Sequence, residues 1–276
     1  MTEALEAARR AGYVCSIASG RALCLIGKSV LGTGLMTHAV VANGAEVWDL
    51  RAGVRLAHRP MAREDALRAL DALADLEPAW NCFLDGRAYF EWAGVSYLMR
   101  GVNGAAARER RRAEHTGIAR RVVSFVRRGL RFAKRLALNR DSRQVRSIRP
   151  IVERTEGGTD KLGCTLADAG RTDEAVVRLR ASGRFEVARM GATEIEVTAA
   201  GVTKASGATL LMDHLGIRGT DAVAFGDGGN DLPMAEVATF VAMGNADEEV
   251  RRRADEVCGT VAEDGVAAWI EARLGV

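Results

Sequence analysis

The sequence predicts an α/β fold in which a parallel sheet forms the core and a second α/β unit is inserted into it. The first observation is a set of three short, mostly apolar runs, each followed by a polar loop, as buried strands of a parallel sheet are. These runs cover residues 14–18, 38–42 and 222–225. The second observation is a change of pattern between 61 and 189. We therefore predict a Rossmann-like core domain over 1–60 and 190–276, with a cap domain over 61–189.

Length and composition leave room for two domains. The chain has 276 residues, of which 48% are hydrophobic, so it can bury one core and carry a second unit. Its five cysteines are scattered without a CxxC pair, which is typical of reduced thiols in a cytoplasmic protein. The four histidines show no metal-ligand spacing. The apolar run from Tyr13 to Leu35 is interrupted by Arg21 and Lys28, so we expect neither a targeting segment nor a membrane segment.

The chain begins with a predicted helix. Residues 2–11 place Leu5, Ala8 and Ala11 at helical spacing, and Gly12 ends the helix. A helix followed by a strand is half of a β-α-β unit. The sheet is therefore expected to lack the strand that would precede this helix.

The next two predicted strands end in loops that suit a ligand. The first runs into Ser19-Gly20-Arg21, whose hydroxyl and backbone N–H groups suit a phosphate, although Ser-Gly is also a common turn. A helix is predicted to begin near Ala22. The second strand brings Asn43-Gly44 to the same edge of the sheet. A hairpin follows, with its strands near 47–48 and 54–56.

The inserted region combines α/β patterns with a basic stretch. A helix is predicted over 64–74, and strands near 82–84 and 88–90. Residues 108–154 hold 16 Lys and Arg against 4 Asp and Glu. This excess could mark a nucleic-acid or membrane surface, or steer anionic substrates, but an amphipathic helix over 122–136 with a solvated basic face explains it as well. No nucleic-acid signature accompanies the charge, so we expect neither a nucleic-acid nor a membrane partner.

The second core segment returns to a strand at 194–197, followed by a loop over 198–202 and a helix over 203–215. Lys204 then lies in the first turn of this helix, where the helix dipole disfavours a cation by a few tenths of a kcal/mol or more. A bound phosphate would offset that cost. An exposed, solvated lysine is the simpler alternative.

The most informative segment is the hexapeptide Gly226-Asp227-Gly228-Gly229-Asn230-Asp231. It follows the apolar strand at 222–225 and precedes Pro233, which is expected to open a helix over 234–238. Two carboxylates and an amide thus arrive at a strand's carboxyl end, where open α/β sheets bind ligands. Carboxylate oxygens suit Mg²⁺. An ordinary strand-to-helix turn is the alternative, which the fixed spacing of the two acids makes less favourable.

Together these motifs resemble those of haloacid dehalogenase superfamily phosphatases, in particular the Cof-type subgroup with an α/β cap. Family motif II is matched by Ser19-Gly20-Arg21, and the family's Asn-Gly pair by Asn43-Gly44-Ala45. Motif III is matched by Gly201-Val202-Thr203-Lys204, and motif IV by the hexapeptide 226–231. The closing segment 261–267 is also similar. The resemblance spans nearly the whole chain.

One departure from the family bears on activity. Such phosphatases begin with a strand that ends in Asp-x-Asp, which supplies the nucleophile and the general acid and base. These 276 residues contain no Asp-x-Asp. The nearest match, Leu84-Asp85-Gly86-Arg87, better fits a hairpin turn in the cap. Three interpretations remain open: a phosphatase whose missing strand is encoded upstream, which we favour, a noncatalytic phosphate-binding remnant, or a nucleic-acid or membrane binder that uses the basic cap segment.

The resemblance implies a hydrolase that uses Mg²⁺ and removes phosphate from a small phosphorylated metabolite, such as a sugar phosphate, through an aspartyl-phosphate. Asp227 and Asp231 would hold the metal, directly or through water. Ser19 and Lys204 would be catalytic, because they offset charge on the transferred phosphoryl group. The substrate-binding residues implied are Ser19, Gly20, Asn43, Gly44, Lys204 and Asn230. Without the nucleophile, the chain as written is expected to be inactive.

Overall fold

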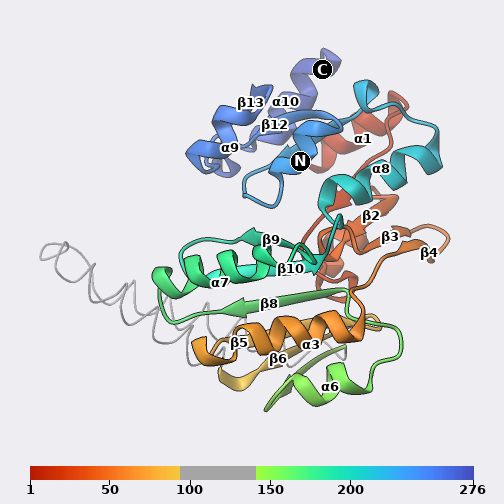
Figure 1. Cartoon of the computed structure of the whole chain (residues 1–276). Coiled ribbons are helices and arrows are strands. Elements are labelled where there is room, and N and C mark those ends of the chain that lie inside the picture. Colours follow the sequence, from red (N-terminus) through yellow and green to blue (C-terminus); the bar gives the residue numbers. More distant parts are fainter. Residues whose placement is uncertain (94–140) are drawn as a thin grey trace, which may run out of the picture.

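The computed structural model describes residues 1–93 and 141–276, which form two units joined by two chain segments (Figure 1). The predicted α/β class is confirmed. The first unit, the core, combines the N-terminal and C-terminal parts of the chain. Its first helix, α1 (Thr2–Arg10), packs against its last, α10 (Gly265–Leu274). The Met1 ammonium group donates to the Asp264 carboxylate at 3.0 Å.

The strands of the core lie in two sheets. The four-stranded sheet has the order β1-β2-β3-β4, in which β1 and β2 are parallel and the others antiparallel. The three-stranded sheet has the order β11-β12-β13 and is entirely parallel. The strands are β1 (Ser16–Ala18), β2 (His38–Val41), β3 (Glu46–Asp49), β4 (Val54–His58), β11 (Val223–Gly226), β12 (Thr239–Ala242) and β13 (Glu256–Val257).

Within the described residues, β1 and β11 form no backbone pairing with each other, and each lies at the edge of its sheet. Ser16 and Ala18 of β1 are exposed, and Val223 of β11 is 40% exposed. These two edges belong to the strands that lead to Ser19 and to Asp227. Helix α8 (Lys204–Leu215) connects the two halves, because Leu211 packs with the four-stranded sheet and Ala205 with the three-stranded one.

The second unit, the cap, is built on one continuous six-stranded sheet with the order β7-β6-β5-β8-β10-β9. Its strands are β5 (Ala79–Leu84), β6 (Arg87–Glu91), β7 (Ser142–Val145), β8 (Lys161–Thr165), β9 (Phe185–Arg189) and β10 (Glu194–Ala199). Helices α3 (Arg63–Ala72), α6 (Arg149–Arg154) and α7 (Ala169–Ala181) bury their apolar sides against one face of this sheet (Figure 1). That face contributes the alternate apolar residues of each central strand.

The position of β10 corrects the predicted boundary between cap and core. Residues 194–199 pair with β8 and β9, so the boundary expected between 189 and 190 falls inside the cap sheet. An apolar strand pattern identifies a strand without identifying its partners. The division into a core and an inserted cap remains a proposal, with the second junction near residue 200.

Two predicted helices differ from the structure. The helix expected from Ala22 is replaced by a 3-10 turn and the four-residue α2 (Lys28–Leu31), because Ile26 and Gly27 adopt extended backbone. The helix expected over 234–238 is a 3-10 turn. The 3-10 turns are Leu23–Leu25, Ala42–Gly44, Ala74–Leu76, Gly219–Asp221, Leu232–Glu236 and Val261–Glu263, and the remaining helix is α9 (Glu248–Arg253).

Two expectations concern other parts of the chain. The amphipathic helix predicted over 122–136 and most of the basic stretch 108–154 lie outside the described residues. Among the helices that the structure does describe, none combines the length and the apolar character that crossing a membrane requires.

Candidate active site

The loop after β2 has an unusual backbone. Ala42, Asn43 and Gly44 are consecutive left-handed residues, with φ angles of 49°, 56° and 96°. This conformation costs a non-glycine residue about 1–2 kcal/mol. Two hydrogen bonds hold the loop to the end of β1: the Ala42 N–H donates to the Arg21 carbonyl at 2.9 Å, and the Asn43 N–H to the Ser19 carbonyl at 3.1 Å. Hydrogen bonds thus join the two predicted motif loops, with backbone strain at Ala42 and Asn43.

Gly44 sets the distance between this loop and α8. A Cβ atom at Gly44 would lie 2.0 Å from the Thr203 carbonyl oxygen, so only glycine allows this approach. Thr203 caps α8 through a reciprocal pair of bonds with Ser206. The structure therefore gives Gly44 a packing function, and its substrate-binding role stays a prediction. The result is that Lys204, the first residue of α8, lies next to the Asn43 loop.

Lys204 is buried and forms an ion pair with Asp231. Its Nζ lies 2.6 Å from Asp231 Oδ1, and both side chains are less than 10% exposed. Asp231 Oδ2 accepts from the backbone N–H groups of Asp227 and Gly228, both at 3.1 Å. We predicted that a bound phosphate offsets the cost of the Lys204 charge in the first turn of the helix. In the structure Asp231 provides that compensation, from 27 residues farther along the chain.

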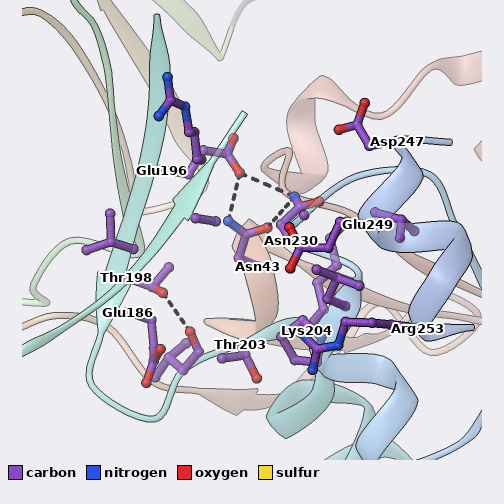
Figure 2. A pocket seen from close by; sticks show the side chains of 18 of the residues that line it. Asn43, Glu186, Glu196, Thr198, Thr203, Lys204, Asn230, Asp247, Glu249 and Arg253 are labelled. Atoms are coloured by element: carbon purple, nitrogen blue, oxygen red, sulfur yellow. Dashed lines mark hydrogen bonds between the residues drawn. The ribbon is translucent and has the colours of Figure 1, made fainter. Parts of the chain in front are cut away.

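A chain of side-chain hydrogen bonds runs from the motif IV loop to the cap (Figure 2). Asn230 Nδ2 donates to Asn43 Oδ1 at 3.2 Å, and Asn43 Nδ2 donates to Glu196 Oε2 at 2.7 Å. Glu196 Oε1 forms an ion pair with the buried Lys161 of β8. Gly20 approaches this cluster so closely that a Cβ there would lie 2.7 Å from Glu196 Oε2 and 2.8 Å from Asn43 Oδ1. Gly20, Asn43 and Asn230, predicted from separate motifs, therefore meet.

Sequence reasoning missed Glu196 and Lys161. Lys161 is a charged residue at the start of a buried strand, and Glu196 alternates with the apolar Ile195 and Val197. A buried lysine requires a partner, so the pattern carried a signal. The partner itself could not be identified, because the pairing of β8 with β10 joins segments about 35 residues apart in sequence.

Three cations lie close together at the site. Burial lowers the pKa of the Lys161 ammonium, the Glu196 carboxylate opposes this, and the nearby cations Lys204 and Arg21 lower it further. Three cations thus act on one another around a single carboxylate cluster. Two of them are paired with carboxylates, Lys161 with Glu196 and Lys204 with Asp231. The Ser19 hydroxyl accepts from the Arg21 N–H at 3.2 Å, which fixes the turn of the motif II loop.

A cavity of about 660 Å³ lies between the core and the β9–β10 hairpin of the cap. Of the predicted site residues, Asn43, Lys204 and Asn230 line it, and Glu196 lines it from the cap. Glu186, Arg189 and Thr198 of the cap also line it. Its outer wall is formed by the exposed residues Asp247, Glu249 and Arg253 at α9 (Figure 2). The cavity has the size of a site for a small molecule.

The residues at motif IV fit a hard cation only in part. Asp227 is exposed at the end of β11, as a metal ligand at a sheet edge must be. The Asp231 carboxylate already pairs with Lys204 and accepts from two N–H groups, so it suits a water-mediated role better than a direct one. Mg²⁺ takes several oxygen ligands, of which the described residues of this loop offer one exposed carboxylate.

A second polar cluster lies where the core meets the cap. Glu46, His58 and Asp160 place their ligand atoms within 4.8 Å of one another, and within the described ranges no other group of three His, Cys, Asp or Glu does so. His58 Nε2 lies 2.6 Å from Asp160 Oδ1, and Arg55 pairs with Glu46 at 2.9 Å. Burial, reinforced by the Glu46 carboxylate, raises the pKa of Asp160 to about 6, although the hydrogen bond to His58 opposes this.

Comparison with known proteins identifies the family of this chain. Residues 1–270 match the family of haloacid dehalogenase-like hydrolases. A pyridoxal phosphate phosphatase of Escherichia coli is 26% identical over 274 residues, which are 99% of this chain and 90% of that protein. A 5-amino-6-(5-phospho-D-ribitylamino)uracil phosphatase of Bacillus subtilis is 36% identical over 111 residues, or 40% of this chain and 45% of that protein.

Among solved structures, the HAD subclass IIB sugar phosphatase BT4131 has a TM-score of 0.73. The alignment covers 98% of this chain and 89% of that one at 22% identity, so the likeness concerns the fold. The family predicted from the motifs is confirmed. The chain belongs to the haloacid dehalogenase-like hydrolases, a family of enzymes, and the relatives named above are phosphatases.

Proposed function

We propose that this site hydrolyses the phosphate ester of a small metabolite with Mg²⁺, and that the attacking carboxylate is missing from these 276 residues. The observation that carries the proposal is the convergence of Asn43, Lys204 and Asn230 on one cavity, with Gly20 in contact with the same cluster. The two relatives named above bear the names of phosphatases of small phosphorylated molecules, which supports this substrate class.

Each residue has a role in the proposed site. The substrate phosphate lies on the Ser19-Gly20 loop, where the Ser19 hydroxyl and backbone N–H groups bind its oxygens. Lys204, fixed in place by Asp231, offsets the charge that the phosphoryl group carries during transfer. Asn43 and Asn230 orient the substrate from the cavity wall.

Asp227 would hold Mg²⁺, which supplies further positive charge at the phosphoryl oxygens. Uncatalysed hydrolysis of phosphate monoesters is extremely slow, so charge stabilisation needs a nucleophile beside it. The described cluster provides charge stabilisation but no nucleophile. Phosphate binding is therefore expected to survive in this chain, whereas turnover is not.

Calorimetry tests the binding part of the proposal. The chain is titrated with Mg²⁺ in the presence of inorganic phosphate, and Asp227→Ala is expected to weaken Mg²⁺ binding at least tenfold. Asp247→Ala is the matched control, because Asp247 lines the same cavity at its outer wall, and it should leave the affinity unchanged. Equal Mg²⁺ affinity of Asp227→Ala and the parent would remove Asp227 from the site.

A further inference from the structure

The cap sheet has an apolar face, which the cap helices cover, and a polar face, on which charged side chains lie beside the apolar Phe83 and Ala88. Trp80, Leu162 and Ile195 of neighbouring strands lie in the apolar cluster beneath the cap helices. Glu196 pairs in register with Gly163, so side-chain alternation places Glu196 and Lys161 on the opposite face. The hydrogen bond from Asn43 shows that this polar face meets the core at the candidate site.

The Glu196 carboxylate has capacity for a further hydrogen bond. It accepts from Lys161 through Oε1, and through Oε2 from Asn43 at 2.7 Å and from Asn230 at 3.5 Å, whereas a carboxylate can accept about four hydrogen bonds. The Lys161 side chain is only 3% exposed, but that of Glu196 keeps 19% of its surface exposed. Glu196 also lines the cavity, so its carboxylate lies next to the space that a ligand would occupy.

Glu196 also lies beside the loop on which the phosphate is proposed to bind. Its Oε2 is 2.7 Å from the position that a Cβ at Gly20 would take. The leaving group of a phosphate ester bound at this loop would lie close to Asn43, Asn230 and Glu196, because all three side chains approach Gly20. An anion at that junction accepts from O–H donors and repels acceptors.

We propose that Glu196, held in place by Lys161, determines specificity by accepting a hydrogen bond from a hydroxyl of the leaving group close to the ester oxygen. The favoured substrates are hydroxylated phosphate esters, and esters of simple alkyl chains are disfavoured. This inference rests on the proposed function, because it requires phosphate to bind at the Ser19-Gly20 loop. A ligand without that hydroxyl would displace water from the Glu196 carboxylate without replacing its hydrogen bond, which weakens binding relative to the hydroxylated ligand.

The test compares two ligands that share a three-carbon chain and a phosphate: sn-glycerol 3-phosphate, which has a neighbouring hydroxyl, and n-propyl phosphate, which has none. Calorimetry on the 276-residue chain with Mg²⁺ is expected to give at least tenfold tighter binding of the glycerol ester. In Glu196→Gln this ratio should fall at least threefold, with inorganic phosphate bound as in the parent. Glu249→Gln, which removes an equal charge from the outer cavity wall, should keep the parent's ratio.

A double variant, Lys161→Met with Glu196→Leu, replaces both charges and leaves neither buried alone. Its ratio should be near one. An unchanged ratio in both variants would overturn the inference. A second contradicting result would be that Glu196→Gln binds inorganic phosphate more tightly while the ratio of the two ester affinities stays constant. Glu196 would then only compete with phosphate for Asn43. If the parent binds no inorganic phosphate, the proposed function fails instead.

Discussion

The cap and the core differ in how their strands are held together. The cap sheet is continuous over six strands, and helices cover its apolar face. In the described residues, the parallel strands of the core lie in two separate sheets, and α8 connects them. The elements of the cap are therefore held in place by one continuous sheet. Those of the core depend on contacts between loops, and these loops carry the predicted site residues.

This difference shows where the chain tolerates change. In the core, Gly44, Lys204 and Asp231 connect segments from three parts of the chain, so each is expected to matter more than an equivalent residue in the cap. The following predictions compare such pairs, beginning with the largest expected effect.

The largest expected effect is that of Gly44→Ala. The new Cβ would lie 2.0 Å from the Thr203 carbonyl, and the backbone φ of 96° is unfavourable for alanine. We expect a loss of about 5 kcal/mol, enough to unfold a domain of ordinary stability. Gly86→Ala is the cap control, since φ is also positive there but no atom lies within 4 Å, and should cost about 1 kcal/mol. Urea unfolding measures both; equal losses would contradict the importance of this core contact.

Asp231→Ala is expected to destabilise the protein by about 3 kcal/mol, because it leaves the Lys204 charge buried without its partner and deprives two N–H groups of their acceptor. Asp221→Ala removes a carboxylate from an exposed pair with Arg218 and should cost less than about 1 kcal/mol. Thermal and urea unfolding provide the comparison. A loss from Asp231→Ala no larger than that from Asp221→Ala would show that the Lys204 pair does not hold the core together.

The cluster of Glu46, His58 and Asp160 predicts a smaller effect, which depends on pH. Folding raises the pKa of Asp160 from 3.8 to about 6, so between these values the folded protein holds a proton that the unfolded chain releases. The free energy of unfolding should therefore fall by roughly 2 kcal/mol as pH rises from about 4 to 6, and this contribution should then level off. Asp160→Asn should flatten the profile in that window. If parent and variant share one slope, Asp160 does not titrate as described.

Sequence reasoning succeeded where the determinants are local. Helix α1, the β3–β4 hairpin and the β5–β6 hairpin follow from spacing and turn residues within a few positions. The Asp85-Gly86 turn has φ angles of 51° and 70°, as a two-residue hairpin turn requires, so the predicted hairpin turn is confirmed. The meeting of Gly20, Asn43 and Asn230 followed from a further rule, that parallel strands present their carboxyl ends at one edge.

The failures concern interactions between distant segments. Nothing within residues 194–199 indicates that this strand pairs with β8 and β9 rather than with core strands. The partners of Lys204 and Glu196 depend on how α8, motif IV and the cap sheet are positioned in three dimensions. Periodicity and motif spacing carry information about neighbours along the chain. They therefore indicate the helix or strand on which a charged residue lies, but not the distant residue with which it pairs.

The most direct test of the central claim is hydrolysis of a generic aryl phosphate with Mg²⁺, measured alongside thermal unfolding. It compares the 276-residue chain with versions that carry an added N-terminal apolar strand ending in Asp-x-Asp or, as matched control, Asn-x-Asn. Both added strands should raise the unfolding temperature by covering the edges of β1 and β11, and only Asp-x-Asp should give turnover. Turnover by the 276-residue chain at the rate of the Asp-x-Asp version would contradict the account.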